Sequence, residues 1–129
     1  GDCHPKNSLF DQGCIALIDL DQAGVGSPAA DIASLLARLE HGRLLGETDG
    51  ATAAALGEAF LAGYAGVRAL PSPASLGWHV AAALIAERAV RAVNRVGTRA
   101  LGRLAELTDV AFDVAMAASS APDTRGGRS

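Results

Sequence analysis

The stretch that decides the fold is the first twenty-one residues, GDCHPKNSLFDQGCIALIDLD (Gly1–Asp21). Two short β-prone runs, Ser8–Asp11 and Cys14–Asp19, flank the pair Gln12-Gly13. Glycine supplies the positive φ that a tight turn needs, so this pattern predicts a β-hairpin. Because a hairpin brings the outer ends of its strands together, the second strand should return Asp19 towards Asn7.

Oxygen-bearing side chains lie around this hairpin at fixed separations. Asp2 and Asn7 precede it, and Asp19 ends the second run, where the period of two places it on the side of Ile15 and Leu17. Two carboxylates and an amide arranged in this way suit metal-assisted phosphoryl transfer. One carboxylate can receive the proton of an acceptor hydroxyl, while the other oxygen donors hold Mg²⁺, a hard cation.

Three motifs follow one another within thirty-three residues: GDCHPKN at 1–7, CIALIDLD at 14–21 and GSPAADIA at 26–33. Their order and spacing resemble the pattern H-G-D-x-H-x-x-N, apolar hairpin with I-D, and G-x-P-x-x-D-[LI]-A of the aminoglycoside phosphotransferase and choline kinase-like family. The His that opens this pattern is not in the sequence. The remainder of the chain is similar to the helical tail of that family, without further motifs.

The resemblance implies a role for each matched residue. Asp2 is expected to be the catalytic base, and Asn7 and Asp19 are expected to be the metal ligands. Asp31, in the third motif, is expected to be buried and to hydrogen-bond the backbone of the catalytic loop; stabilisation of a helix N-terminus is the alternative.

Two further residues are expected to support the site. His4 should support the catalytic loop, because as a base it would duplicate Asp2. Asp21 has three possible roles: a second metal ligand, a loop stabiliser or an exposed acid. The last two together are favoured over the first.

The implied fold is α+β and mostly α: the C-terminal lobe of a protein-kinase-like fold, with a catalytic loop, a short hairpin and about four helices. This lobe should span residues 1–118, with the catalytic loop and hairpin over 1–21 and a helical subdomain over 28–118. The nucleotide-binding lobe of the family precedes these motifs and is absent here, so the chain is interpreted as a catalytic fragment that is inactive alone. Residues 119–129 are small and polar and are predicted to be disordered.

Apolar residues at steps of three and four predict the helices. They are expected over residues 28–43, 52–70, 74–96 and 99–118. Ser27 should cap the first, with Pro28 at its first position. Gly97 should end the third, and Thr98 should cap the fourth. The second helix is expected to turn one face inward, formed by Ala53, Leu56, Phe60, Tyr64 and Val67.

The composition bounds the class of protein. The chain has 129 residues, of which 50% are apolar and only 4% aromatic, which is typical of one domain of closely packed helices. No apolar run approaches the ~18 residues of a membrane span and no leader is evident, so a cytoplasmic location without a membrane partner is predicted. Cys3 and Cys14 could approach each other across the hairpin, but reduced thiols are expected in that compartment.

Charge is unevenly distributed along the chain. Residues 1–60 hold nine acidic and three basic residues, whereas residues 61–129 hold five acidic and eight basic ones. The acidic half contains the candidate metal site, although acids are also common at loops and helix ends. Arginines recur every three or four residues at Arg88, Arg91, Arg95, Arg99 and Arg103.

The arginine stripe has two interpretations. A solvated helix face is favoured over a surface for phosphate or an acidic partner. The absence of interleaved aromatic residues argues against a nucleic-acid partner. Trp78 and His79 are expected to pack in the core and at its edge rather than to act in a site.

Together, the residues and the resemblance predict the catalytic part of a phosphotransferase that uses Mg²⁺ and ATP or GTP. The γ-phosphate would pass to a hydroxyl of a small molecule such as an aminoglycoside, a choline-like compound or a sugar. The acceptor and the oligomeric state are not set by the sequence. The alternatives are a non-catalytic helical domain that keeps the kinase-like fold, and an interaction module that uses the arginine stripe.

Overall fold

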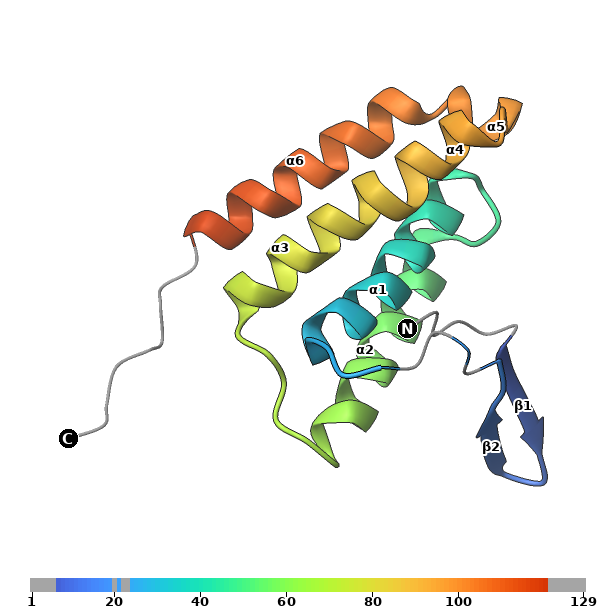
Figure 1. Cartoon of the computed structure of the whole chain (residues 1–129), viewed down its shortest axis with the longest axis vertical. Helices are drawn as coiled ribbons and strands as arrows, with labels where there is room; N and C mark the ends of the chain where they lie inside the picture. Colours follow the sequence, from blue (N-terminus) through green and yellow to red (C-terminus); the bar gives the residue numbers. More distant parts are fainter. Residues whose placement is uncertain (1–6, 20, 22–23, 121–129) are drawn as a thin grey trace.

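The computed structural model of the chain describes residues 7–19, 21 and 24–120. A two-stranded antiparallel hairpin is followed by a mostly helical body, as the α+β prediction requires (Figure 1). The elements are β1 (Ser8–Asp11), β2 (Cys14–Leu17), α1 (Pro28–Leu44), α2 (Gly50–Ala65), α3 (Pro73–Ala83), the π-helical η2 (Leu84–Ala89), α4 (Val90–Asn94), α5 (Thr98–Leu101) and α6 (Leu104–Ser120).

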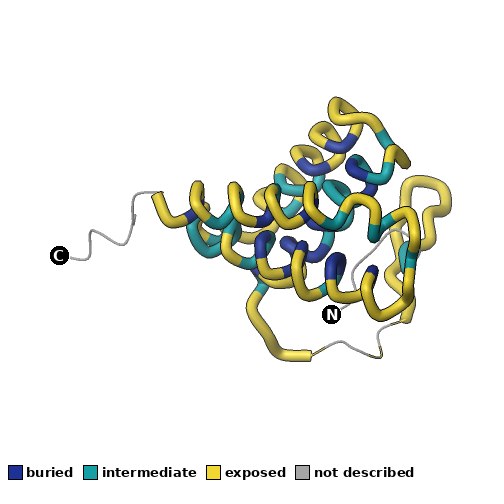
Figure 2. The backbone as a smooth tube through the Cα atoms, turned by 90° about the horizontal axis from the view of Figure 1, so that it is seen from above, coloured by how far each residue is buried: buried dark blue, intermediate teal, exposed yellow. Residues whose placement is uncertain are grey.

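The body is a stack of helices with α3 in the middle. Helix α3 packs against α1 on one side and α6 on the other, and α2 covers the remaining side of α1 (Figure 1). Buried positions line the facing sides of these helices (Figure 2). The largest fully buried side chains are Ile32, Leu84 and Leu107, and the rest of the core is mostly alanine.

Small residues allow the helices to approach closely. A Cβ atom added at Gly77 in α3 would lie 2.7 Å from the Cβ of Ala118 in α6. A Cβ added at Gly57 in α2 would lie 3.4 Å from the side chain of Leu36 in α1. The alanine-rich, aromatic-poor composition therefore produces the close helix contacts that it predicts.

Helix α1 matches its prediction, and α2 does not match fully. Ser27 and Pro28 begin α1 as expected, although the Ser27 side chain makes no capping hydrogen bond. Helix α2 ends at Ala65 rather than near residue 70, and its predicted inner face is partly wrong. Leu56 is 51% exposed and Val67 lies beyond the helix, because the close contact at Gly57 turns a different face towards α1.

The third predicted helix is a single helical run over residues 73–94, interrupted by the π-helical turn η2. Ser72 begins it by accepting a hydrogen bond from the Ser75 backbone N–H at 3.2 Å. The end differs from the prediction, because Val96 rather than Gly97 takes the left-handed conformation, with φ of 49°. Gly97 is instead the N-cap of α5, so Thr98 is already helical.

The fourth predicted helix is divided in two. Gly102 ends α5 and α6 begins at Leu104. Glycine is a poor helix former, which explains the break at this position. Helix α6 extends to Ser120, so Ser119 and Ser120, predicted to be disordered, are helical; residues 121–129 lie outside the described part of the chain.

Two helices end in the same hydrogen-bond pattern but with different residues at its left-handed position. At the end of α1, Gly46 has φ of 67°, and Glu47 and Gly46 donate to the carbonyls of Gly42 and Arg43. At the end of α4 the corresponding backbone bonds run from Gly97 to Ala92 and from Val96 to Val93. Both are Schellman motifs, in which glycine is the usual left-handed residue.

Replacing Val96 with glycine should therefore stabilise the protein by about 1 kcal/mol, because a β-branched residue is strained at positive φ. Val96 is 70% exposed, so little packing is lost. The matched variant Gly46→Val should destabilise by a similar amount. Urea unfolding measures both free energies, and destabilisation by Val96→Gly would contradict this account of the helix end.

Candidate functional site

The hairpin brings Asn7 and Asp19 to one end of the two strands. Its register pairs Ser8 with Leu17 and Asp11 with Cys14. The Ile18 backbone N–H then donates to the Asn7 carbonyl at 2.8 Å, which extends the pairing by one residue. The backbone thus returns Asp19 to the vicinity of Asn7, as the hairpin pattern predicts.

The turn at the other end of the hairpin follows the sequence. Gln12 and Gly13 both have positive φ, 44° and 85°. Two consecutive left-handed residues are the geometry of the tight hairpin turns that match strand twist. The pair Gln12-Gly13 therefore forms the tight turn that joins the two antiparallel strands.

The conformation of Asp19 differs from the prediction. The second strand ends at Leu17, and Asp19 has φ of 57°, so the period of two no longer governs its side chain. In a regular pleat, Asn7 and its partner Ile18 would share one face and Asp19 would lie on the other. The left-handed conformation of Asp19 breaks this alternation. A metal ion shared with Asn7 requires such a break, because the two side chains would otherwise lie on opposite faces.

Positive φ at a residue other than glycine is uncommon, although Asp tolerates it better than most. Such conformations cost on the order of 1 kcal/mol or more and concentrate at binding and catalytic sites. Asp19 is thus held by its surroundings in a backbone geometry that has a cost for folding. This observation marks the open end of the hairpin as the candidate site.

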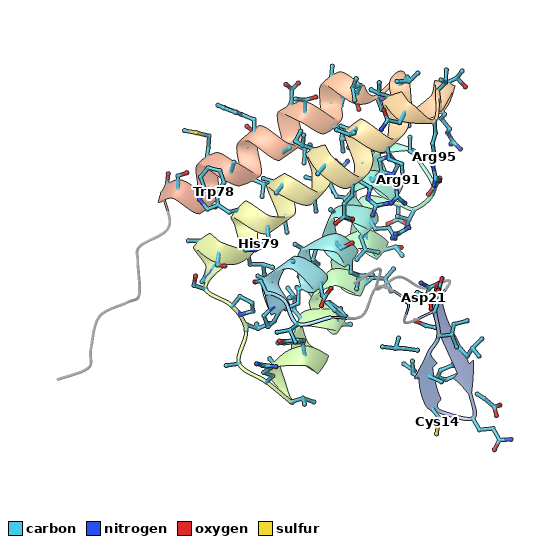
Figure 3. All side chains as sticks on the ribbon, viewed as in Figure 1. Cys14, Asp21, Trp78, His79, Arg91 and Arg95 are labelled. Carbon is cyan, nitrogen blue, oxygen red and sulfur yellow. The ribbon has the colours of Figure 1, made fainter. Side chains whose placement is uncertain are left out.

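The labelled side chains place two other predicted residues relative to this end. Asp21 lies at the open end of the hairpin, and Cys14 lies at the turn (Figure 3). Asp21 is exposed, which leaves its role as a ligand or a supporting acid a prediction. Cys14 is an exposed free thiol. Cys3 lies outside the described residues, so the expected reduced state of the pair stays a prediction.

Asp31 is exposed, in contrast with its expected burial. The buried face of this part of α1 is formed by Ala29, Ile32 and Ala33, so the core is covered without Asp31. Its position in the first turn of α1 fits the alternative, stabilisation of the helix N-terminus. The catalytic loop that Asp31 was expected to support includes Asp2 and His4, which both lie outside the described residues.

The donors at the open end fit a hard cation. Asn7 contributes an amide oxygen and Asp19 a carboxylate, the ligand types that Mg²⁺ prefers. Within residues 7–19, 21 and 24–120, no three His, Cys, Asp or Glu side chains converge as metal ligands. A site at this end would therefore combine Asp19 with the Asn7 amide and with donors outside that range.

A partly buried polar cluster lies elsewhere, between α1 and η2. The Ser34 hydroxyl donates to Glu87 Oε2 at 2.7 Å, and Arg88 Nη2 donates to the same oxygen at 2.8 Å. Arg88 is only 6% exposed, so the prediction of a fully solvated arginine stripe is wrong at this residue. Burial and the positive charge of Arg88 lower the pKa of the nearby His41.

This cluster was not predicted, because its partners are separated by 53 residues and no local pattern joins them. The other arginines of the stripe behave as the solvated interpretation expects. Arg103 forms an exposed ion pair with Glu106 at 2.6 Å, and Arg91, Arg95 and Arg99 are exposed. An exposed pair of this kind contributes little to stability.

The structure contradicts the prediction for Trp78 and agrees with the prediction for His79. Trp78 is 53% exposed, so it is not a core residue. His79 is partly buried, and its Nδ1 lies 2.7 Å from the Ser75 carbonyl, as suits a residue at the edge of the core. Both residues lie on α3, which packs against α6 and continues into η2 (Figure 3).

Comparison with known proteins adds the family. A search of curated proteins and a search of solved structures each return no match. No helix in the described part of the chain is both long enough and apolar enough to cross a bilayer. A model of the phosphotransferase enzyme family matches residues 1–70, which include all three motifs and more than half of the chain. The chain therefore belongs to the phosphotransferase enzyme family.

Proposed function

We propose that this chain carries the catalytic part of a small-molecule kinase that transfers the γ-phosphate of ATP or GTP to a hydroxyl group. Membership of the phosphotransferase family supports the class of reaction. The observation that carries the proposal is the backbone bond from Ile18 to Asn7, 2.8 Å long, followed directly by the left-handed Asp19. This geometry supports a shared role for the amide and the carboxylate.

In this proposal Asn7 and Asp19 hold Mg²⁺, and Asp2 orients the acceptor hydroxyl and takes its proton. The metal, when bound, neutralises negative charge on the phosphates. Such transfer depends mainly on positioning and charge, so fixed donors on a hairpin are suited to it. His4 and Asp21 have supporting roles, and Asp31 stabilises the N-terminus of α1.

The proposed architecture is the C-terminal lobe of a protein-kinase-like fold over residues 1–118, preceded by a nucleotide-binding lobe. The hairpin supports this arrangement, because one of its faces is apolar and exposed: Phe10, Ile15 and Leu17 are 75%, 70% and 54% exposed there, and Leu9 on the other face is 56% exposed. A two-stranded hairpin with an open apolar face is marginal on its own and gains stability from a covering surface. We place the protein in the cytoplasm, with a small hydroxylated acceptor.

Paramagnetic Mn²⁺ can test the metal site in this chain directly. Mn²⁺ should broaden the amide NMR signals of Asn7, Ile18 and Asp19 strongly and those of Asp11 and Cys14 weakly. The turn lies about 13 Å from the open end, since a strand rises ~3.3 Å per residue.

Two alanine variants make the test specific. Asp19→Ala should remove the selective broadening, whereas Asp11→Ala, the same change at the far end of the hairpin, should preserve it. Uniform broadening along the hairpin, or selective broadening that persists in Asp19→Ala, would rule out Asp19 as a ligand.

A further inference from the structure

The contact between α1 and the π-helical turn η2 contains a charge that is nearly removed from water. Arg88 in η2 is 6% exposed, and its Nη2 donates to Glu87 Oε2 at 2.8 Å. The same carboxylate oxygen accepts the Ser34 hydroxyl of α1 at 2.7 Å. The Nε atom of Arg88 is buried and makes no hydrogen bond with the described residues. A single carboxylate oxygen therefore joins the two elements and pairs with the buried cation.

His41 lies on the side of α1 that faces this contact. Ser34, Arg38 and His41 are separated by four and three residues, so they follow one face of the helix. His41 is partly buried. Burial and the positive charges of Arg88 and Arg38 lower its pKa. A proton on His41 would thus add a positive charge close to the one that Arg88 already carries.

The acidic groups nearby do not offset this effect. Glu47 follows α1, and its Oε2 lies 3.6 Å from the position that a Cβ atom on Gly42 would occupy. Its carboxylate raises the pKa of His41, but burial and the two arginines outweigh it. Glu47 is exposed, so water weakens its attraction for a proton on His41. Glu87 already accepts from both Ser34 and Arg88.

We propose that His41 makes the α1–η2 contact a proton-sensitive latch, because protonation of its ring beside the buried Arg88 weakens the attachment of α1 to η2. Like charges repel strongly where the surroundings exclude water. Histidine is the side chain whose ordinary titration lies closest to neutral pH. The π-helical turn that holds Arg88 is itself a rare element that often occurs at functional positions. The latch does not involve Asn7 or Asp19, so it does not depend on the proposed metal site.

Stability should fall as the pH is lowered past the ordinary histidine pKa of about 6.5. Below this pH the unfolded chain binds a proton at His41 that the folded chain resists. The equilibrium constant for unfolding therefore rises by up to about tenfold per pH unit. This rise ends when the pH passes the lowered pKa of His41 in the folded chain. Above about pH 7.5 His41 is neutral in both states and has no such effect.

NMR titration of the His41 ring in the full chain tests the charge environment. Its midpoint should be lower in the folded chain than in the same chain unfolded in urea. Glu47→Gln should lower the folded midpoint further, and Arg38→Gln should raise it. The backbone amide signals of Ser34 and Arg88 should shift with the same midpoint as the ring, and this shift should disappear in His41→Gln.

Urea unfolding at pH 7.5 and pH 5.5 tests the consequence for stability. The rise in the unfolding equilibrium constant between these pH values should be about three- to tenfold larger in the parent chain than in His41→Gln. His79→Gln is the matched control, because His79 is also partly buried but lies on α3, with its Nδ1 2.7 Å from the Ser75 carbonyl. This control should keep the response of the parent chain. Circular dichroism at pH 7.5 confirms folding, and the exposed change Glu47→Gln keeps the test decisive if His41→Gln unfolds.

Three results would overturn the proposal. The first is a His41 midpoint in the folded chain that equals or exceeds the midpoint in urea. The second is a pH response of unfolding that His41→Gln leaves unchanged. The third is a set of Ser34 and Arg88 amide signals that do not follow the His41 ring.

Discussion

Asp19→Ala should lower kcat for phosphoryl transfer by about 100- to 1,000-fold in the phosphotransferase that contains this chain, or by more. Removal of a single charge-stabilising group from a preorganised site has effects of this size. The proposed role of Asp19 is to hold Mg²⁺, and neutralisation of phosphate charge by that ion is central to this chemistry. Initial rates of nucleoside diphosphate release at saturating nucleotide, acceptor and Mg²⁺ measure the effect.

The control is again Asp11→Ala, an exposed Asp of the same hairpin, which should leave kcat within about twofold of the parent protein, as is usual for a surface substitution. Asp21→Ala distinguishes the roles left open for Asp21, since a ligand would approach the effect of Asp19→Ala and an exposed acid would resemble the control. A variant with Asp19→Ala that retains full kcat would refute the proposed metal site, whatever the outcome at Asp21.

Leu84→Ala should be the most destabilising of the changes considered, with a loss of about 3 kcal/mol in the free energy of unfolding. Leu84 is 0% exposed and lies where α3 passes into η2, packed in the cluster that includes Leu44, Leu107 and Ala111. The loss combines the lost burial of the side chain with the cavity that remains. Four residues of this cluster are alanines (Ala37, Ala83, Ala89 and Ala111), whose short side chains have little reach to fill that space.

Leu56→Ala makes the same chemical change at a half-exposed position of α2. It should cost less than about 1 kcal/mol, because water already reaches the side chain and alanine is the better helix former. Urea denaturation gives both free energies. Similar losses for the two variants would mean that Leu84 is not part of a packed core.

Predictions that depend on neighbouring residues succeeded along much of the chain. The pair Gln12-Gly13 predicts the hairpin turn, and Ser27-Pro28 predicts the start of α1. The third helix, expected from residue 74, begins one residue earlier, at Pro73. These signals act within a few residues, through φ preferences and local hydrogen bonds. The motifs of residues 1–33 likewise predicted the family that the match over residues 1–70 shows.

Predictions that depend on distant packing were less successful. The inner face of α2 was predicted around Leu56, but the contact of Gly57 with Leu36 decides which face turns to α1. Arg88 was assigned to a solvated stripe, but it is buried beside Glu87, to which Ser34 of α1 also donates. Neither outcome could be obtained from periodicity, because each depends on a residue more than a helix away in the chain.

The hairpin, the starts of α1 and α3 to within a residue, the family and the nature of the oxygen donors at Asn7 and Asp19 could be read from the sequence alone, since turn propensities and motif chemistry are local. Only the tertiary structure decided that Asp19 leaves the pleat in a left-handed conformation, that Val96 ends α4, and that Trp78 lies exposed on α3. The physical reason is that backbone strain and side-chain exposure depend on the whole fold. Packing elsewhere in the molecule offsets the free-energy cost of a strained backbone or an exposed apolar side chain, and no short stretch of sequence could offset that cost alone.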